Sequence, residues 1–288
     1  MNKIEKRYKE LKEIGVRNSY FLPLAAPNYM KENMDVTELP IDKYEADISF
    51  VGSVLEDEKR NIGPLSNNNE LKDATKGYLA GCVACQLQTK KLPPMGEKLP
   101  SYVWEDLKNV YPPKMQNSLE SVSKYYTNTH FNDYITYDSR IFYLGNLVNI
   151  RKYNKIHHYS RYEINVDKGI KYCGWADYYK ELPLVAKNSK INIVLAHYNL
   201  QAGISTAAWG IMAAGGFLLA NEQADYSILE PAKVVLFGDI HEMRQKVEYY
   251  YGHEEERMAV ANVLSKEISK KHTYKHRIEE MLSIILEK

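Results

Sequence analysis

The sequence of 288 residues predicts an α/β protein, with a parallel Rossmann-like sheet flanked by helices and a helical insertion. The first indication is that predicted strands at about residues 47, 156, 170, 191, 217 and 234 alternate with helical patterns, as parallel sheets require. The second is the stretch 190–225, where an apolar run, a helical pattern and another apolar run follow one another. This order predicts a βαβ unit with a right-handed crossover.

In this central unit, residues 191–195 form a short apolar run, as expected for a parallel strand buried on both faces. Residues 204–214 are small and apolar and predict a helix that ends at Gly215 and Gly216, a common C-terminal stop. Residues 217–220 then predict the second buried strand.

The turn before the central helix carries Gln201, Gly203, Ser205 and Thr206. A helix N-terminus that follows a strand presents N–H groups and a positive dipole end, which suit an anion such as a diphosphate. A buried structural βαβ unit without a ligand explains the same spacing equally well. The pattern alone leaves both interpretations open.

Upstream, residues 47–51 predict another buried strand, which ends at Gly52 and Ser53. A glycine at the carboxyl end of a strand lets the backbone approach a ligand closely. A plain tight turn is the alternative, and the local pattern favours it when taken by itself.

Two short strands are predicted between the insertion and the central unit. Residues 155–160 contain His157 and His158, which we expect to be surface residues with a structural role. Residues 169–173 form the other strand, which Gly174 closes. A helix is expected over residues 175–187.

After the central unit, residues 234–237 predict the last strand, and Asp239 is expected to cap a helix that runs to Tyr251. Residues 253–271 and 273–287 predict two further amphipathic helices. His272 and His276 have a zinc-compatible i, i+4 spacing, but no Glu or Cys completes such a site, so we interpret them as structural. In the last helix, Tyr274 and Ile278 are expected to face inward.

The N-terminal part of the chain predicts an amphipathic helix over residues 2–14, a strand over 20–24 and a polar linker over 28–42. Three further helices, which together would form the insertion, are predicted over residues 71–92, 118–134 and 139–152. Within the first of them, Cys82 and Cys85 form a C-x-x-C motif. Because no second ligand pair accompanies it, the motif favours small core residues over a zinc or redox site.

Composition excludes several classes of function. The formal net charge of +1 at pH 7 and the scattered basic residues argue against a nucleic-acid partner. No run of 18 apolar residues suggests a membrane span. The three cysteines and the lack of a secretory segment favour a cytoplasmic location.

Several segments, in their order and spacing, resemble the bacterial glycosyltransferases of the GT-B fold that are related to spore-maturation proteins and to glycosyl transferases group 1. The chain reads SKINIVL at 189–195, GISTAAWGIMAAGGFLLANEQAD at 203–225, LEPAK at 229–233, KVEYYYGHEEER at 246–257 and HTYKHRIEEML at 272–282. Upstream the resemblance takes in YFLPLAAP at 20–27, ADISFVGS at 46–53 and YCGWADYYKELP at 172–183. It covers most of the chain, weakly over residues 57–163.

The resemblance implies that residues 45–288 form a nucleotide-sugar-binding domain with a helical insertion at about 57–153. Residues 1–44 would be a remnant of an N-terminal, acceptor-side domain and its linker. Two positions depart from the family pattern. Ala207 stands where the family has an arginine for the donor phosphates, and Gly210 stands where it has an acidic residue for the ribose.

The function implied is transfer of a sugar from a nucleotide-activated donor to an unknown glycan, protein or small-molecule acceptor, with no metal or other cofactor. The resemblance implies that the donor is held by these residues: Gly52, Ser53, Gly174, Trp175, Tyr178, Gly203, Ser205, Thr206, Asn221 and Gln223. For Trp175 and Tyr178, stacking on the base and a core role are equally expected. No catalytic residue is assigned. The alternative is a degenerate or truncated, non-enzymatic homologue that binds nucleotides or acts as a partner protein.

Overall fold

The structure, a computed structural model, describes most of the chain in eleven stretches. They are residues 16, 20, 22–28, 41–52, 69–88, 100–110, 132–148, 155–163, 169–197, 203–229 and 234–286. The expected helix over residues 2–14 and nearly all of the expected linker lie outside these stretches.

The described strands form one six-stranded, fully parallel sheet in the order β3-β2-β1-β4-β5-β6. They are β1 (Ala46–Val51), β2 (Ile156–Tyr159), β3 (Ile170–Tyr172), β4 (Ser189–Val194), β5 (Leu218–Asn221) and β6 (Val235–Phe237). This is the strand order of the doubly wound dinucleotide-binding folds, in which the winding direction reverses between β1 and β4. The predicted fold class and all six strand positions are confirmed.

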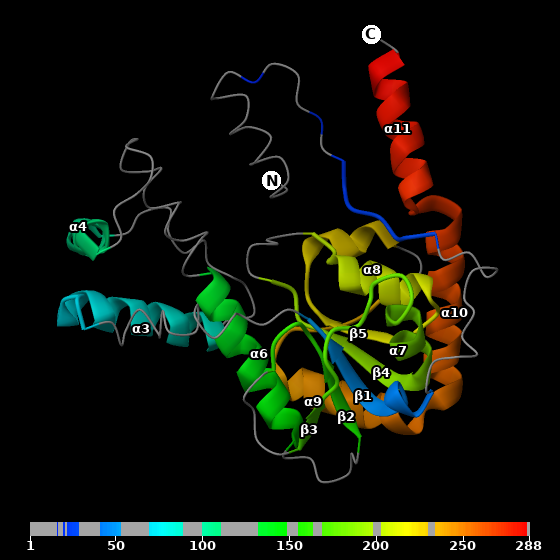
Figure 1. The fold of residues 1–288 in the computed structure, drawn as a ribbon, viewed down its shortest axis with the longest axis horizontal. Helices are drawn as coiled ribbons and strands as arrows, with labels where there is room; N and C mark the ends of the chain where they lie inside the picture. The colour runs from blue at the N-terminus through cyan, green and yellow to red at the C-terminus, as the bar shows by residue number, and fades with distance from the viewer. Residues whose placement is uncertain are drawn as a thin grey trace.

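Helices cover both faces of the sheet (Figure 1). On one face, α6 (Asn132–Val148) and α9 (Ile240–Gly252) pack on a cluster that includes Phe50 and Ile193. On the other face, α7 (Leu182–Asn188), α8 (Thr206–Ala213) and α10 (Glu254–Lys271) pack around Leu218. Strands with two covered faces must be apolar on both, which explains the continuous apolar runs in the sequence.

Helix α8 ends as the sequence predicts. Gly215 has a φ of +82°, its amide donates to Met212 O, and the amide of Gly216 donates to Ile211 O. This is the left-handed helix stop that glycine tolerates without strain. Gly216 has a second reason to be glycine, since an added Cβ would lie 2.6 Å from Ala186 O.

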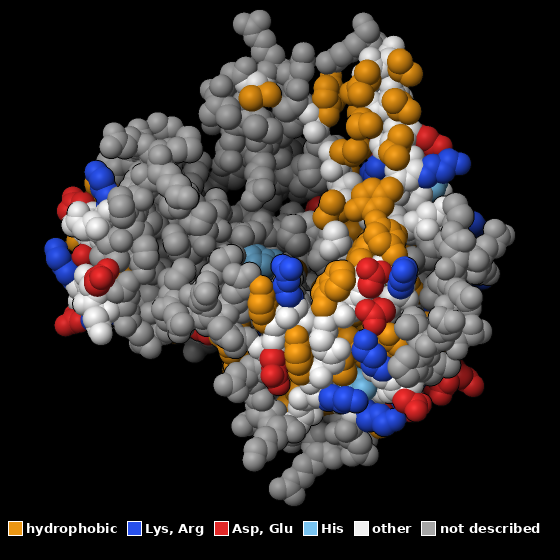
Figure 2. Space-filling model, viewed as in Figure 1, with side chains coloured by type: hydrophobic (Ala, Val, Ile, Leu, Met, Phe, Trp, Pro, Cys, Tyr) orange, Lys and Arg blue, Asp and Glu red, His pale blue; other side chains and the backbone are white. Residues whose placement is uncertain are grey.

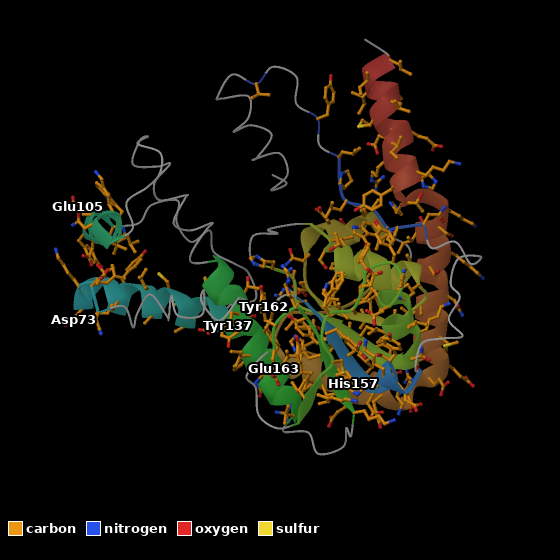
Figure 3. All side chains as sticks on the ribbon, in the orientation of Figure 1. Asp73, Glu105, Tyr137, His157, Tyr162 and Glu163 are labelled. Atoms are coloured by element: carbon orange, nitrogen blue, oxygen red, sulfur yellow. The ribbon has the colours of Figure 1, made fainter. Side chains whose placement is uncertain are left out.

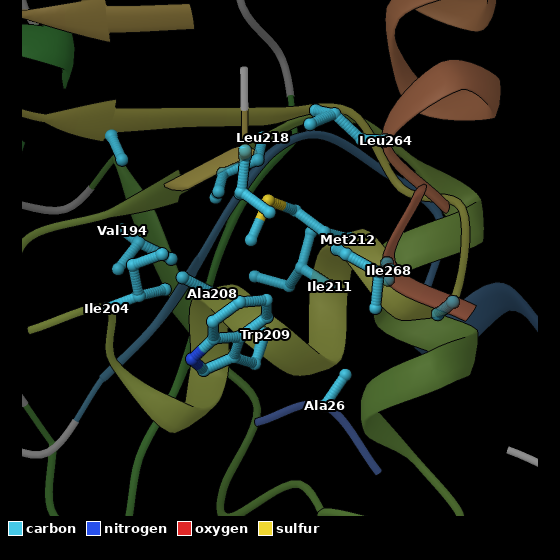
Figure 4. Packing of buried hydrophobic residues seen from close by; sticks show 14 of the residues in the cluster. Ala26, Val194, Ile204, Ala208, Trp209, Ile211, Met212, Leu218, Leu264 and Ile268 are labelled. Carbon is cyan, nitrogen blue, oxygen red and sulfur yellow. The ribbon is translucent and has the colours of Figure 1, made fainter. Parts of the chain in front are cut away.

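The buried side of α8 is centred on Trp209, which is 1% exposed (Figure 4). Its ring lies beside His272 with a centroid separation of 5.8 Å, and it belongs to the same cluster as Ala26 and Ile268. Trp209 therefore joins α8 to α10 and to the short extended segment of residues 22–28.

That N-terminal segment differs from the prediction. Residues 22–25 are not part of a strand, and the expected strand over residues 20–24 is wrong where the structure describes it. Instead, Ala26 forms an isolated parallel bridge with Thr273, and Pro23 O accepts a hydrogen bond from Arg277 Nε. The segment thus runs along the start of α11 (Tyr274–Leu286) rather than entering the sheet.

The helical insertion is present in part. Helix α3 (Asp73–Gln88) and α6 match predicted helices, whereas α4 (Ser101–Val110) was not foreseen. Residues 118–131 of the helix expected over 118–134 lie outside the described residues. Cys85 is exposed and Cys82 is only half-buried, so the expectation that both are core residues is wrong.

The helix expected over residues 175–187 begins later, as α7 at Leu182. In the segment before α7, side-chain oxygens accept hydrogen bonds from backbone amides. Asp177 Oδ1 accepts from the amides of Tyr179 and Lys180, and Glu181 Oε2 accepts from the amide of Asp177. Such local side-chain contacts favour a turn over a helix.

At the C-terminus, α9, α10 and α11 match the predicted helices, and Asp239 caps α9 by accepting from the amide of Glu242 at 2.9 Å. The predicted orientation of α11 is wrong, because Tyr274 is 38% and Ile278 53% exposed. Figure 2 shows a row of apolar side chains along this helix.

The two histidines of β2 are buried rather than on the surface, with His157 at 4% and His158 at 1% exposure. The reason is the position of β2 inside the sheet, between β3 and β1. His157 Nδ1 lies 3.3 Å from the hydroxyl of Tyr159, which itself donates to Lys43 O. Burial lowers the pKa of His157 from its ordinary value of 6.5.

This pKa predicts a loss of stability in mild acid. Below about pH 6.5 the unfolded chain binds a proton at residue 157, whereas folded His157 stays neutral until a lower pH. The free energy of unfolding should therefore fall as the pH decreases from about 7 to 5. We expect His157→Gln to reduce this dependence in urea unfolding. The same change at exposed His241 is the control, and an unchanged slope in His157→Gln would contradict the prediction.

Candidate functional site

The strand order places the candidate site at the carboxyl edge of the sheet, where β1 and β4 lie side by side and the winding direction reverses. In doubly wound sheets, ligands bind in the crevice at this point, because the two chain segments leaving the strands turn to opposite faces. Here, β1 continues toward the insertion and α6, while β4 continues toward α8.

Gly52 immediately follows β1, and its amide donates to Tyr159 O at 3.2 Å. An added Cβ would lie 2.6 Å from Cζ of Phe50, so the ring of Phe50 is a structural reason for this glycine. Ser53 and Gln201 lie outside the described residues. Gly203 is half-buried and precedes the first turn of α8.

The first turn of α8 presents backbone donors. Ser205 is the N-cap residue, and its Oγ accepts from the amide of Ala208 at 3.2 Å. Within the described part of the chain, no acceptor faces the amides of Thr206 and Ala207. These two amides lie at the positive end of the helix dipole, a combination that can bind anions.

The loop after β3 is hydrogen-bonded to the first turn of α8. The hydroxyl of Tyr178 donates to Thr206 O at 3.0 Å, and burial raises the pKa of Tyr178. Gly174 has a φ of +78°, and its carbonyl accepts from the amide of Ser160 at 2.9 Å. Hydrogen bonds thus join the loop after β3 to the segment after β2 and to the first turn of α8.

The two aromatic candidates in this loop, Trp175 and Tyr178, differ in how exposed their side chains are. Tyr178 is half-buried and packs against the α8 cluster, so part of its surface is committed to the fold. Trp175 is 63% exposed. Of the two, the exposed ring of Trp175 is the better surface on which a planar group can stack.

The end of β5 lies next to the end of β4. Asn221 Oδ1 accepts from the amide of Ala196 at 2.7 Å, which joins the two strands where they leave the sheet. Gln223 is half-buried and starts a turn in which its carbonyl accepts from the amide of Tyr226. The oxygen of Asn221 is occupied in this arrangement, so its amide nitrogen is the group with donor capacity for a ligand.

One charged side chain at this edge was not foreseen. Arg140 of α6 is 6% exposed, and its Nη2 donates to Leu195 O at 2.9 Å. The guanidinium carbon lies 5.7 Å from the centre of the Phe50 ring. The sequence predicted the helix, but its pattern gave no sign that this arginine reaches the carboxyl ends of two strands.

The two positions at which the chain departs from the family pattern, Ala207 and Gly210, are partly or fully buried. Gly210 is buried inside α8, and Ala207 is half-buried and packs on the same cluster. Because Gly210 is buried, a carboxylate at this position would lose its hydration. The packing around α8 is therefore compatible with the two small residues and with no larger polar side chain at Gly210.

Among the residues that the structure describes, no group of three or more His, Cys, Asp or Glu side chains is arranged to hold a metal ion. His276 Nδ1 lies 2.7 Å from Thr273 Oγ1, and His272 packs on Trp209. Both histidines thus have structural roles. None of the described helices is long and apolar enough to cross a membrane.

Comparison with known proteins gives one family. Residues 141–283 match a family model described as glycosyl transferase-like. The matched region extends from α6 into α11 and includes β2 to β6, the first turn of α8 and the loop that carries Trp175. No curated protein matches the chain.

Proposed function

We propose that this chain, which carries a glycosyl transferase-like domain in residues 141–283, transfers a sugar from a nucleotide-activated donor in the manner of GT-B glycosyltransferases. The observation that carries the proposal is the first turn of α8. This turn follows β4, next to the point where the winding direction of the sheet reverses, and no acceptor among the described residues faces the amides of Thr206 and Ala207. A donor diphosphate has the charge and shape for this position.

Each candidate residue then has a physical role. The two α8 amides hold the diphosphate, while Gly52 and Gly203 keep the adjoining backbone close to it. Trp175 stacks on the base, and the side-chain nitrogens of Asn221 and Gln223 donate to sugar hydroxyls. In the reaction the bond between the sugar and the diphosphate oxygen breaks while a bond forms between the sugar and the acceptor, which loses a proton, and negative charge grows on the leaving diphosphate. The positive helix end stabilises that charge.

Other parts of the proposal follow the family resemblance. Residues 45–288 would be the donor-binding domain, with the insertion at about 57–153. Neither a metal nor another cofactor takes part, and the acceptor and the catalytic base are not assigned. Ser53 belongs to the proposed site by its place directly after Gly52.

A second candidate function is nucleotide binding without catalysis, by a degenerate homologue or a partner protein. Ala207 and Gly210 favour it, because neither can supply the arginine or the carboxylate of the family pattern. Loss of a charged bidentate contact costs about 1.5–3 kcal/mol, or roughly ten- to hundredfold in affinity. Both candidates predict nucleotide binding, and only the first predicts turnover.

We expect weak, saturable binding of a nucleoside diphosphate, with a Kd on the order of millimolar. Ligand-observed NMR titrations with UDP, GDP and ADP measure it, and the corresponding nucleosides are the controls for the diphosphate contribution. Incubation with the matching nucleotide sugars then separates the two candidates through release of the diphosphate. If none of the three nucleotides gives a saturable signal, both candidates are wrong.

A further inference from the structure

Helix α11 carries an apolar stripe that no described helix or strand covers. Six of its large apolar side chains are between 38% and 79% exposed, and no residue of the helix is buried. They are Tyr274, Ile278, Met281, Leu282, Ile285 and Leu286. Figure 3 shows α11 extending away from the sheet beyond its first turn, with no helix or strand of the described chain beside it.

The spacing of these residues places them on one side of the helix. Positions 274, 278, 281 and 285 are four, three and four residues apart, which is the spacing of a helix that packs lengthwise against another helix. A helix of 13 residues is only marginally stable in water by itself, and proteins stabilise such helices by covering the apolar face. We therefore expect an occupant for the stripe on α11.

The described part of the N-terminal segment lies beside this stripe. The amide of Ala26 donates to His272 O, and the amide of Tyr274 donates to Ala26 O. Further along, Arg277 Nε donates to Pro23 O. These three hydrogen bonds hold the segment along the first turn of α11. The residues that precede Pro23 in the chain therefore start within reach of the stripe.

Residues 2–14, which lie outside the described residues, have a sequence pattern that fits this position. Ile4, Tyr8, Leu11 and Ile14 follow one another at intervals of four, three and three residues, and charged residues fill most of the positions between them. In a helix that rises 1.5 Å per residue, Ile4 and Ile14 are about 15 Å apart along the axis. The stripe of α11, from position 274 to 285, is about 17 Å long by the same measure. The two apolar faces thus match in length.

The covalent connection favours this segment over a partner in solution. Nine residue steps separate Ile14 from Pro23, and an extended chain of that length spans about 30 Å, more than the length of α11, which is about 20 Å. A short connection of this kind gives an effective concentration on the order of millimolar. A second copy of the chain at micromolar concentration competes at a disadvantage of roughly a thousandfold.

We infer that residues 2–14 form an amphipathic helix that packs on the apolar stripe of α11. The N-terminal residues then serve as an intramolecular cover for the last helix, and the two ends of the described chain belong to one folded unit. The inference does not depend on the proposed donor site.

Backbone amide hydrogen exchange of the full chain, followed by mass spectrometry, tests this contact. In the unmodified protein the amides of α11 should be protected. In the double variant Tyr8→Gln with Leu11→Gln they should exchange at least about tenfold faster, because α11 then loses its cover. The amides of β4, which lies inside the sheet, report global unfolding and should keep their rate.

The same segment offers a matched control. Lys9→Gln with Lys12→Gln also changes two residues of the segment, but at its charged positions, and should leave the exchange of α11 unchanged. The reciprocal variant changes the stripe instead. Ile278→Gln with Ile285→Gln should accelerate exchange at the amides of residues 4–14, because the segment then loses the surface on which it packs.

Three results would overturn the inference. The first is fast exchange of α11 in the unmodified protein, which would mean that the stripe has no occupant. The second is equal acceleration in the Lys9→Gln with Lys12→Gln control. The third is protection that survives Tyr8→Gln with Leu11→Gln; if this protection rises with protein concentration, a second copy of the chain is the occupant. None of these results bears on UDP binding, so the proposed function is tested separately.

Discussion

Replacement of Trp209 by alanine is expected to lower the free energy of unfolding by about 3–5 kcal/mol, the usual range for loss of a large buried aromatic side chain. Trp209 is 1% exposed and joins α8 to Ala26 and to His272, so its removal leaves a cavity among three separate segments. These segments are fixed by their own hydrogen bonds, which limits collapse into the cavity. Urea unfolding followed by circular dichroism measures the change.

The matched control is Trp175→Ala. This side chain is 63% exposed, and a substitution there should change the free energy of unfolding by no more than about 0.5 kcal/mol. It is also the proposed base-stacking residue, so Trp175→Ala should weaken nucleotide binding in a protein of normal stability. A loss below about 1.5 kcal/mol in Trp209→Ala would show that the packing around α8 is looser than described.

Replacement of Asn192 by leucine is expected to cost about 2–5 kcal/mol. Asn192 is fully buried in β4, where its Nδ2 donates to Ala186 O at 3.0 Å and Phe217 O at 3.1 Å. Its Oδ1 accepts from Ser49 Oγ at 2.7 Å. Leucine has a similar volume but leaves these buried groups without their partner, and each such group costs about 1–3 kcal/mol.

Two comparisons separate this polar effect from packing. Asn146→Leu, at a half-buried position of α6 where Nδ2 donates to Phe142 O within the same helix, should change stability by about 0.5 kcal/mol or less. Addition of Ser49→Ala to Asn192→Leu removes one stranded hydroxyl, so the double variant should be more stable than the sum of the single changes predicts. Strict additivity would contradict the hydrogen-bonded network.

The central strands of the sheet could be predicted from the sequence because they are short, largely apolar runs that end at turn residues. Gly215 is an example, since a φ of +82° needs a residue that tolerates the left-handed region. The burial of His157 could not be predicted, because it depends on strand order, which a local pattern does not contain. The late start of α7 depends on how Asp177 and Glu181 use their side chains.

The helix that follows β4 was predicted from the sequence over residues 204–214, whereas its start at Thr206, with Ser205 as the N-cap, was not. The hydrogen bond from Tyr178 to Thr206 O joins elements that are distant in sequence. The sequence analysis assigned both residues to the donor site but did not predict a contact between them. Arg140 was missed because its position follows from how α6 packs on the sheet. A helix pattern identifies the inward face of α6 but not how far an arginine on it reaches.

A diphosphate site at the start of α8 is tested most directly by the backbone amide spectrum of the ¹⁵N-labelled protein during a UDP titration. We predict that the resonances of Gly52, Gly203, Thr206 and Ala207 move together and saturate with one Kd. The first amides of α9, whose N-cap Asp239 is itself an anion, are the internal control and should not move. Equal shifts at both helix starts, or unmoved Thr206 and Ala207 amides while UDP binds, would contradict a donor site at the point where the sheet reverses its winding.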